Sequence, residues 1–178
     1  MKYLRLSLIA VLMSIAMSTV ASAQLVDGDR AGIQRRNLVS SNPIGLLFEW
    51  YQGEYEHAFS DAFSLAVAGA SFNLSDDDVA SVDVIGRYYP GGRALRGFSL
   101  GATAGFSGIT EEVCDQVSCR EEDYSAFTLG VRGDYVWILG REQHLAVAAG
   151  VGAKRLFSDR IDGIEGLPVG RLSIGYAW

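Results

Sequence analysis

Few residues of this 178-residue chain have side chains suited to catalysis. One of the two histidines, His57, lies in the segment EYEHAFSD at 54–61, which also holds Ser60, and the other, His144, follows the segment GREQ. A nucleophile, a base and an orienting acid act together only within hydrogen-bond reach of one another, and sequence spacing alone does not show this. We therefore interpret both histidines as interfacial imidazoles and predict that the chain is not an enzyme.

The two cysteines are the other reactive side chains. Cys114 and Cys119 are separated by four residues in the polar segment EEVCDQVSCREED, whereas a redox-active C-x-x-C motif has two residues between its cysteines. Two His and two Cys do not build a typical zinc site without carboxylate ligands, so we predict no metal and no cofactor. In an oxidising compartment the pair predicts a disulfide that closes a small loop.

The first 23 residues have the features of a secretory signal peptide. Lys2 and Arg5 precede an apolar stretch at 6–17, and the segment Ala21–Ala23 has the A-x-A cleavage pattern. We predict cleavage after Ala23, followed by a polar lead-in at 24–41. The alternative, a short membrane anchor, is disfavoured because the apolar stretch is too short to span a bilayer.

Composition excludes several classes of protein. Fifteen Lys and Arg against 21 Asp and Glu give a net charge of −6, which argues against nucleic acid as a partner because phosphates require basic contacts. After residue 23, no apolar run approaches the roughly 18 residues that a membrane-spanning helix needs. A helical membrane protein is therefore excluded.

From residue 42 onward, apolar and small polar residues alternate. In GFSLGATAGFSG at 97–108, Phe98, Leu100 and Phe106 share one face, while Ser99 and Thr103 lie on the other. Similar alternation recurs at 127–137, 145–157 and 171–178, with turn signals between the runs. This period of two indicates β-strands, and we predict one all-β unit at 42–178.

The polar face decides between two barrel designs. A soluble barrel presents many Lys, Glu, Ser and Asn side chains to water, and a membrane barrel places its apolar face outward instead. Here the non-apolar face is mostly Gly, Ala, Ser and Thr with isolated charges, including Glu54 and Glu56. Small residues with matched charges suit a narrow interior whose ions pair with one another. The predicted lumen ion-pair network consists of Glu49, Asp83, Arg87, Arg132, Asp134, Lys154 and Arg171.

Aromatic residues gather at two levels of the predicted strands, as they do at the two interfaces of a membrane. The level that we place on the periplasmic side holds Phe59, Phe63, Tyr88, Tyr89, Phe98, Tyr135, Trp137, Tyr176 and Trp178. The opposite level holds Trp50, Tyr51, Phe72, Phe106, Tyr124, Phe127 and Phe157. Short links at 60–61, 90–96 and 140–143 then fall on the periplasmic side, and longer loops at 109–123 and 158–166 on the outer side. The sequence thus predicts a closed antiparallel up-and-down transmembrane β-barrel.

The number of strands is about eight. The 137 residues of 42–178 allow about 17 residues for each of eight strands with its connection, enough for a crossing of about 9–11 residues. Direct counting gives seven runs, so we predict a hairpin that rises over 43–51, turns at Gln52-Gly53 and descends over 53–59. In the competing arrangement, residues 25–40 supply the first strand.

The last residues, RLSIGYAW, resemble the C-terminal signal of bacterial outer-membrane barrels. Arg171 stands at the polar position and Tyr176 and Trp178 at the aromatic ones, whereas Ser173 replaces the usual glycine. The segments NPIGLLFEWYQGEYEHAFSD, RYYPGGRALRGF and LPVGRLSIGYAW are also similar to a family of small outer-membrane barrels, close in size to OmpA and OmpX. This resemblance implies a bacterial outer-membrane location and recognition of the C-terminal segment by the barrel-insertion machinery.

Together these features predict a non-enzymatic, monomeric barrel with an ion-paired, plugged lumen. It would act in envelope integrity or through its extracellular loops. Its expected partners are outer-membrane lipids and lipopolysaccharide, whose phosphates Arg155 and Arg160 could contact. Two alternatives remain: a lipid-A-modifying barrel enzyme using His57 or His144, and a narrow channel for small solutes.

Overall fold

The computed structural model describes residues 35–74, 77–114, 119–157 and 166–178. These residues belong to one compact unit, Gln34–Trp178. The predicted signal peptide and its cleavage site lie outside the described residues. Within the described ranges, no helix has the length and apolar character required to cross a membrane.

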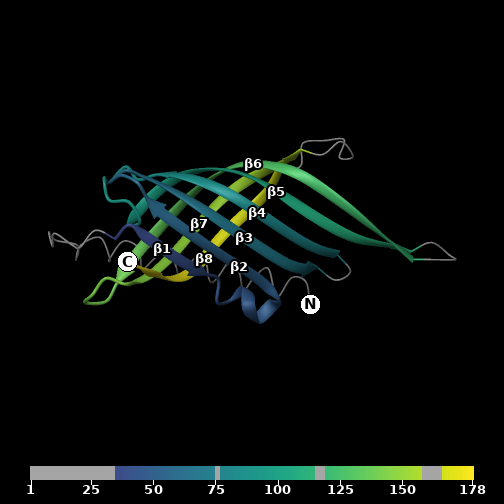
Figure 1. Ribbon diagram of the computed structural model, residues 1–178, viewed down its shortest axis with the longest axis horizontal. Coiled ribbons are helices and arrows are strands. Elements are labelled where there is room, and N and C mark those ends of the chain that lie inside the picture. The colour runs from purple at the N-terminus through teal and green to yellow at the C-terminus, as the bar shows by residue number, and fades with distance from the viewer. Residues whose placement is uncertain (1–34, 75–76, 115–118, 158–165) are drawn as a thin grey trace, which may run out of the picture. The chain divides into compact units, whose positions relative to one another are not determined.

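Eight antiparallel strands form a closed barrel in which each strand pairs with its neighbours in chain order and β1 pairs with β8 (Figure 1). This confirms the predicted all-β, up-and-down architecture. A short 3₁₀ helix, η1, lies between β1 and β2. The elements are β1 Asn37–Ser41, η1 Gly45–Phe48, β2 Trp50–Ala58, β3 Phe63–Leu74, β4 Asp77–Tyr88, β5 Gly97–Cys114, β6 Cys119–Leu139, β7 Leu145–Phe157 and β8 Gly166–Ala177.

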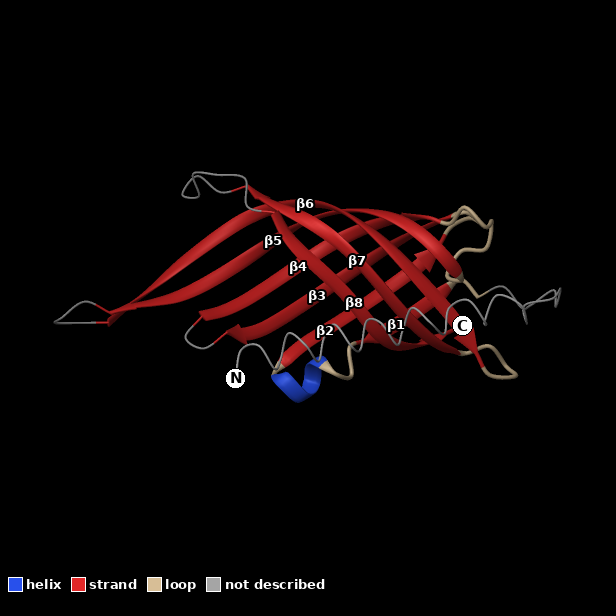
Figure 2. Cartoon of the chain, turned by 180° about the vertical axis from the view of Figure 1, so that it is seen from behind, coloured by secondary structure: helices blue, strands red, loops and turns tan. Residues whose placement is uncertain are grey.

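The barrel has two unlike ends, both visible in Figure 2. The turn end holds the links 59–62, 89–96 and 140–144 together with both ends of the barrel chain, because Trp178 follows β8 there and Arg36 precedes β1. The loop end holds residues 42–49 and the opposite ends of the strands, among them Leu74, Cys114 and Phe157. The strands β5 and β6 extend to Cys114 and Cys119, so the predicted long loop at 109–123 is wrong: its residues are mostly strand.

The start of the barrel also differs from the prediction. Residues 50–58 form one strand through Gln52-Gly53, so the predicted hairpin at 43–59 is wrong. The first strand is β1, within the segment predicted as a polar lead-in, and the barrel therefore begins at residue 37 rather than 42. The turn falls instead at Asn42, whose side-chain oxygen accepts hydrogen bonds from the backbone N–H groups of Ile44 and Gly45. Such a side-chain-capped turn favours a break in the strand at this point.

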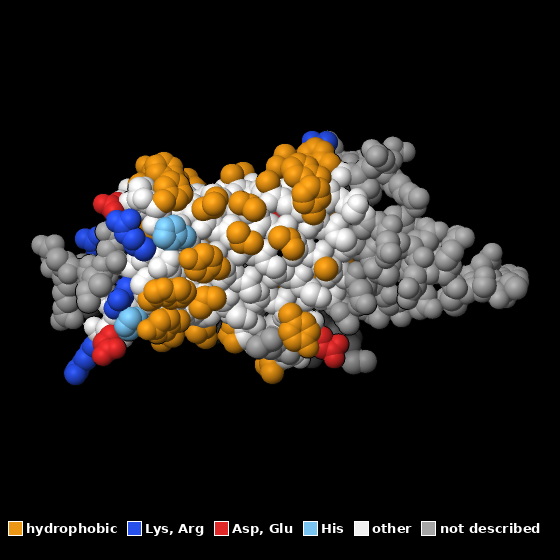
Figure 3. Space-filling model, viewed as in Figure 1, with side chains coloured by type: hydrophobic (Ala, Val, Ile, Leu, Met, Phe, Trp, Pro, Cys, Tyr) orange, Lys and Arg blue, Asp and Glu red, His pale blue; other side chains and the backbone are white. Residues whose placement is uncertain are grey.

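The apolar face of the barrel points outward. Leu100 of β5 and Ile174 of β8, which belong to the apolar face, are 52% and 49% exposed. Asp134 of β6, which belongs to the polar face, is 1% exposed. Figure 3 shows the hydrophobic side chains spread over the outer surface between the two ends. Because strand side chains alternate between faces, this outward apolar face leaves the polar and small residues inside the barrel.

Aromatic side chains ring both ends of the outer surface. At the turn end, Phe63 packs between Phe59 and Tyr88, and at the loop end Phe127 packs between Phe106 and Phe157. The prediction that Tyr89 belongs to the aromatic ring at the turn end is wrong. It follows β4, turns into the barrel and is 1% exposed. The side chain of Tyr124 lies outside the described residues.

Candidate functional site

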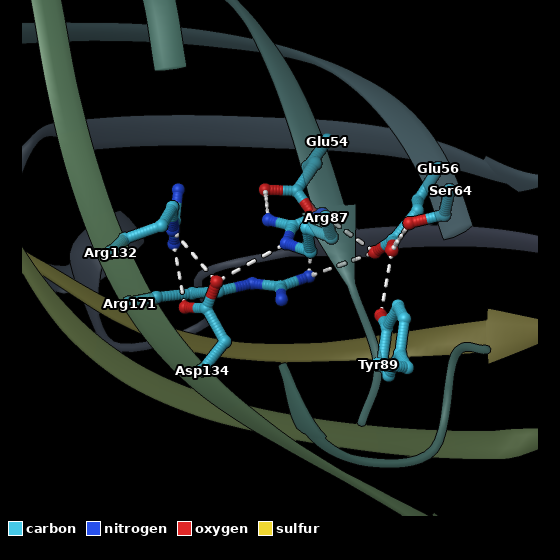
Figure 4. A network of polar contacts seen from close by, with 8 residues as sticks. All are labelled: Glu54, Glu56, Ser64, Arg87, Tyr89, Arg132, Asp134 and Arg171. Carbon is cyan, nitrogen blue, oxygen red and sulfur yellow. Dashed lines mark hydrogen bonds and ion pairs between the residues drawn. The ribbon is translucent and has the colours of Figure 1, made fainter. Parts of the chain in front are cut away.

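The centre of the lumen is occupied by one arginine bound to three carboxylates (Figure 4). Arg87, on β4, is completely buried, and its Nη1 lies 3.0 Å from Glu54 and 2.7 Å from Glu56. Its Nε lies 3.2 Å from Asp134, on β6. The side chains reach one another because alternate positions of β2, β4 and β6 all point inward. Arg87 thereby connects opposite walls of the barrel.

Two further arginines complete this cluster. Arg171, on β8, donates to Glu54 at 2.5 Å, and Arg132, on β6, contacts Asp134 through both Nε and Nη2 at 2.8 and 2.9 Å. A separate ion pair lies between Lys154 of β7 and Asp83 of β4. We call these eight residues the ion-pair network: Glu54, Glu56, Asp83, Arg87, Arg132, Asp134, Lys154 and Arg171.

The ion-pair network is electrically balanced. Four carboxylates face four cations, giving a formal charge of zero. Balance is required because each ion of a buried pair loses several kcal/mol of hydration, which its partner must offset. Loss of a single member would therefore leave an uncompensated buried charge.

Six of the seven predicted network residues lie in the lumen, and Glu49 does not. Glu49 caps η1 in a left-handed conformation (φ 59°) and is exposed, so its prediction as a lumen residue is wrong. Glu54 and Glu56, which the predicted network omitted, are instead its central acids. The alternation of the sequence could have identified these two acids, because they flank the outward-facing Tyr55 and so share the inward face of β2. Glu49, in contrast, precedes the strand.

Glycines on neighbouring strands make room for the charged side chains. A Cβ atom at Gly150 would lie 1.9 Å from Asp134 Oδ1, and one at Gly105 would lie 2.3 Å from Asp83 Oδ1. Arg132 lies similarly close to Gly101 and would meet a Cβ there at 2.9 Å. The glycines of the lumen face are therefore needed by the network, because a charged side chain can lie against the barrel wall only where the neighbouring strand has no Cβ atom in its way.

A hydrophobic floor closes the lumen at the turn end. Tyr89 donates a hydrogen bond of 2.7 Å to Glu56, and burial, followed by the charge of Glu56, raises the pKa of the Tyr89 hydroxyl well above its usual value. Leu95 adopts a left-handed conformation (φ 65°) that accompanies a fully buried side chain. The floor consists of Leu38, Ala58, Tyr89, Ala94, Leu95, Val136, Ala146, Ala148 and Ala177.

Toward the loop end, the network borders a cavity of about 320 Å³, which we call the loop-side cavity. Asp83, Arg132 and Lys154 contribute its charged lining. Its apolar lining includes Trp50, Phe72, Val79, Leu156, Pro168 and Val169. The lumen is thus closed by apolar packing at one end and hollow toward the other.

Within the described ranges, no catalytic triad forms around either histidine. His57 points outward and its Nδ1 lies 2.8 Å from Asn37 Oδ1, whereas Glu54 points into the lumen. The Ser60 hydroxyl accepts a hydrogen bond from the backbone N–H of Phe63. His144 stacks on Tyr176 with ring centroids 4.8 Å apart, and its Nδ1 lies 2.7 Å from the carbonyl oxygen of Ala177. Both imidazole rings are therefore engaged in contacts at the turn end of the barrel.

Cys114 and Cys119 lie directly opposite each other at the loop-end tips of β5 and β6. Directly paired residues of antiparallel strands have Cα atoms about 4.5–5.5 Å apart, within the range that a disulfide spans. The disulfide itself stays a prediction, because the two side chains lie outside the described residues.

We expect purified protein to give no reaction with a maleimide reagent under denaturing conditions until a reductant is added, and then to gain two labels per chain. A single substitution, Cys119→Ser, should give one label without reductant. Two labels on the unreduced wild-type protein would contradict the disulfide.

These features define a class: a small, closed, eight-stranded barrel with a charged interior and an apolar exterior. In comparison with solved structures, the chain is similar to the N-terminal β-barrel domain of Pseudomonas aeruginosa OprF, with a TM-score of 0.52, 13% identity and coverage of 82% of this chain and 98% of that chain. At this identity the likeness shows the fold, that of a small OmpA-like barrel. No family model and no curated protein matches the chain.

Proposed function

We propose that this chain is a non-enzymatic outer-membrane barrel whose lumen is plugged, and that it acts in envelope integrity or through its extracellular loops. The observation that carries the proposal is the inverted distribution of polarity, with an outward apolar face between aromatic rings and a neutralised set of ions inside. Such an exterior suits lipid, because charged side chains at the lipid face are costly.

The two ends of the barrel support an orientation. In bacterial outer-membrane barrels, short turns face the periplasm and longer loops face outward. Here the strands β5 and β6 extend beyond their neighbours at the loop end, past the last β4–β5 pair at Glu111 and the last β6–β7 pair at Phe127. The turn end would therefore face the periplasm, and the loop end, with Arg155 near it, would face lipopolysaccharide. Tyr176 and Trp178 lie on the outer face beside β1 and would be accessible to the insertion machinery before the barrel closes.

A non-conducting barrel is favoured over a channel. Arg87 bridges the lumen, and Tyr89 and Leu95 pack beneath it. An eight-stranded barrel has an interior just wide enough for side chains to fill. The enzyme alternative gains no support from the positions of His57 and His144, which lie at the rim without a triad.

Fractionation and electrical recording test the proposal together. We expect the mature protein in the outer-membrane fraction, with a gel mobility that changes on heating, and no conductance steps in planar bilayers. Recovery of the protein in the soluble periplasmic fraction would contradict the location, and stable conductance steps would contradict the plug. For the role, a deletion strain should admit large antibiotics more readily and recover with the wild-type gene, and unchanged permeability would leave the loops as the functional part.

A further inference from the structure

Polar atoms without hydrogen-bond partners line the loop-side cavity. Among the described residues, nothing pairs with Gln52 Oε1 or Thr103 Oγ1, although both atoms are buried and Thr103 is only 4% exposed. Buried polar atoms in native proteins are nearly always satisfied. Because both residues line the cavity, these two atoms are available to hydrogen-bond a molecule inside it.

The charged part of the lining favours an anion. Arg132 and Lys154 line the cavity together with Asp83, so two cationic side chains of the neutral network border the space. Arg132 uses Nε and Nη2 to bind Asp134, and Figure 4 shows its remaining nitrogen directed away from that carboxylate. A carboxylate in the cavity would find charge-assisted donors there, which are stronger than neutral ones.

The remainder of the lining suits a hydrocarbon chain. Its apolar side chains include Phe72, Val79 and Leu156, with Ala68 and Ala70 between them. The volume of about 320 Å³ equals about ten water-sized groups, since water occupies about 30 Å³ in the liquid. A carboxylate on a chain of about eight carbons would fill this space.

One wall of the cavity borders an unpaired strand edge. The pairing of β1 with β8 ends at Ser41 and Ile174, so residues 166–173 of β8 have no partner strand on that side within the described structure. The cavity-lining residues Pro168, Val169 and Gly170 lie on this stretch. Across the edge, η1 lies against β2, and Gly45 approaches the Trp50 carbonyl oxygen so closely that a Cβ there would lie 2.4 Å from it.

The position of Pro168 agrees with an open edge. The Trp178 N–H bonds to Asn37 of β1, whereas the Ala177 N–H bonds to His144, on the β7 side. The N–H groups of a strand point alternately to its two neighbours, and the pairing of β8 with β7 continues without interruption from Tyr176 to Gly166. The missing N–H of Pro168 therefore falls on the side without a partner strand, where proline is tolerated.

From these observations we propose that the loop-side cavity binds a single-chain carboxylic acid drawn from the surrounding membrane. Its carboxylate lies against Arg132 and Lys154, with Thr103 and Gln52 within reach, and its chain lies along the apolar lining toward the open edge of β8. The inference rests on the proposed membrane location, because only a lipid-facing edge has access to such amphiphiles.

Trp50 lines the cavity and provides the reporter for a binding test. The variant Trp137→Phe/Trp178→Phe leaves Trp50 as the single tryptophan and keeps aromatic rings at both altered positions. In phosphatidylcholine nanodiscs, titration with 8-bromooctanoate should quench Trp50 fluorescence in a saturable manner. The uncharged analogue 8-bromooctanol should bind about tenfold more weakly, because it lacks the ionic hydrogen bonds.

Two further variants, made in this single-tryptophan protein, separate the cavity from the bilayer. Ala70→Phe should abolish the saturable component by filling the cavity. Asp83→Asn/Lys154→Met removes a neutral pair and should weaken octanoate binding toward that of the alcohol. Linear quenching that is equal with and without Ala70→Phe would mean partition into the bilayer only, and equal affinity for the acid and the alcohol would mean no anion site; either result overturns the inference.

Failure of this inference can be told apart from failure of the proposed function. Incorporation into nanodiscs and a heat-dependent gel mobility report membrane folding without reference to the cavity. A folded barrel without saturable quenching overturns only the binding site, whereas a chain that does not enter bilayers overturns the membrane assignment itself.

Discussion

Replacing Arg87 by methionine is expected to lower the free energy of unfolding by about 3–5 kcal/mol. The substitution leaves Glu54, Glu56 and Asp134 in the lumen with only Arg132 and Arg171 to balance them. An uncompensated buried charge is costly because neither water nor a partner stabilises it. Urea titration of the protein in lipid vesicles, followed by tryptophan fluorescence, measures the loss.

Arg93→Met provides the matched control for this experiment. Arg93 is exposed in the β4–β5 link, so its replacement should change stability by no more than about 0.5 kcal/mol. The double variant Arg87→Met/Glu56→Gln restores electrical balance and should recover part of the loss. If Arg87→Met were as mild as the control, the network would not be a cooperative set.

Replacing Val131 by arginine should cost about 2–4 kcal/mol in a bilayer, the value for a cation at the midplane of a barrel's lipid face. Val131 is 67% exposed and lies midway between Phe127 and Tyr135 along β6, which places it between the two aromatic rings. On a water-facing surface, the same substitution at so exposed a position would be nearly neutral. Denaturant titration in vesicles distinguishes these two outcomes.

Leu139→Arg is the corresponding control at the rim. Leu139 ends β6 at the turn end and is exposed to a lesser degree than Val131. A cation near the interface costs only about 0–1 kcal/mol. Equal effects at Val131 and Leu139 would show that the barrel surface does not face a depth-dependent medium.

The fold was predictable because a period of two requires no knowledge of distant contacts. Alternation at 97–108 placed Leu100 outside and Ser99 inside, as the structure has them. The same rule placed Arg87, Arg132 and Asp134 in the lumen, and charge balance suggested that they pair.

What the sequence did not predict depends on local turns and on packing between distant segments. The break at Asn42 depends on a side-chain cap, which moved the first strand into the lead-in. Tyr89 is the exception: it faces inward because it continues the alternation of Ile85 and Arg87, so the period of two already separates it from the outward-facing Tyr88. The loop-side cavity is formed by residues from most of the strands, so no short segment could have revealed it.

The meeting of the first and last strands has a consequence for biogenesis. The carbonyl of Trp178 accepts hydrogen bonds from the backbone N–H groups of Arg36 and Asn37, and β1 pairs with β8 through only four residue pairs. A nascent chain that lacks residues 174–178 would therefore remain an open sheet with two unpaired edges, prone to pairing with other chains. Synthesis of residues 174–178 is thus a physical precondition for ring formation, and products that stop before them would be left as substrates for proteolytic disposal.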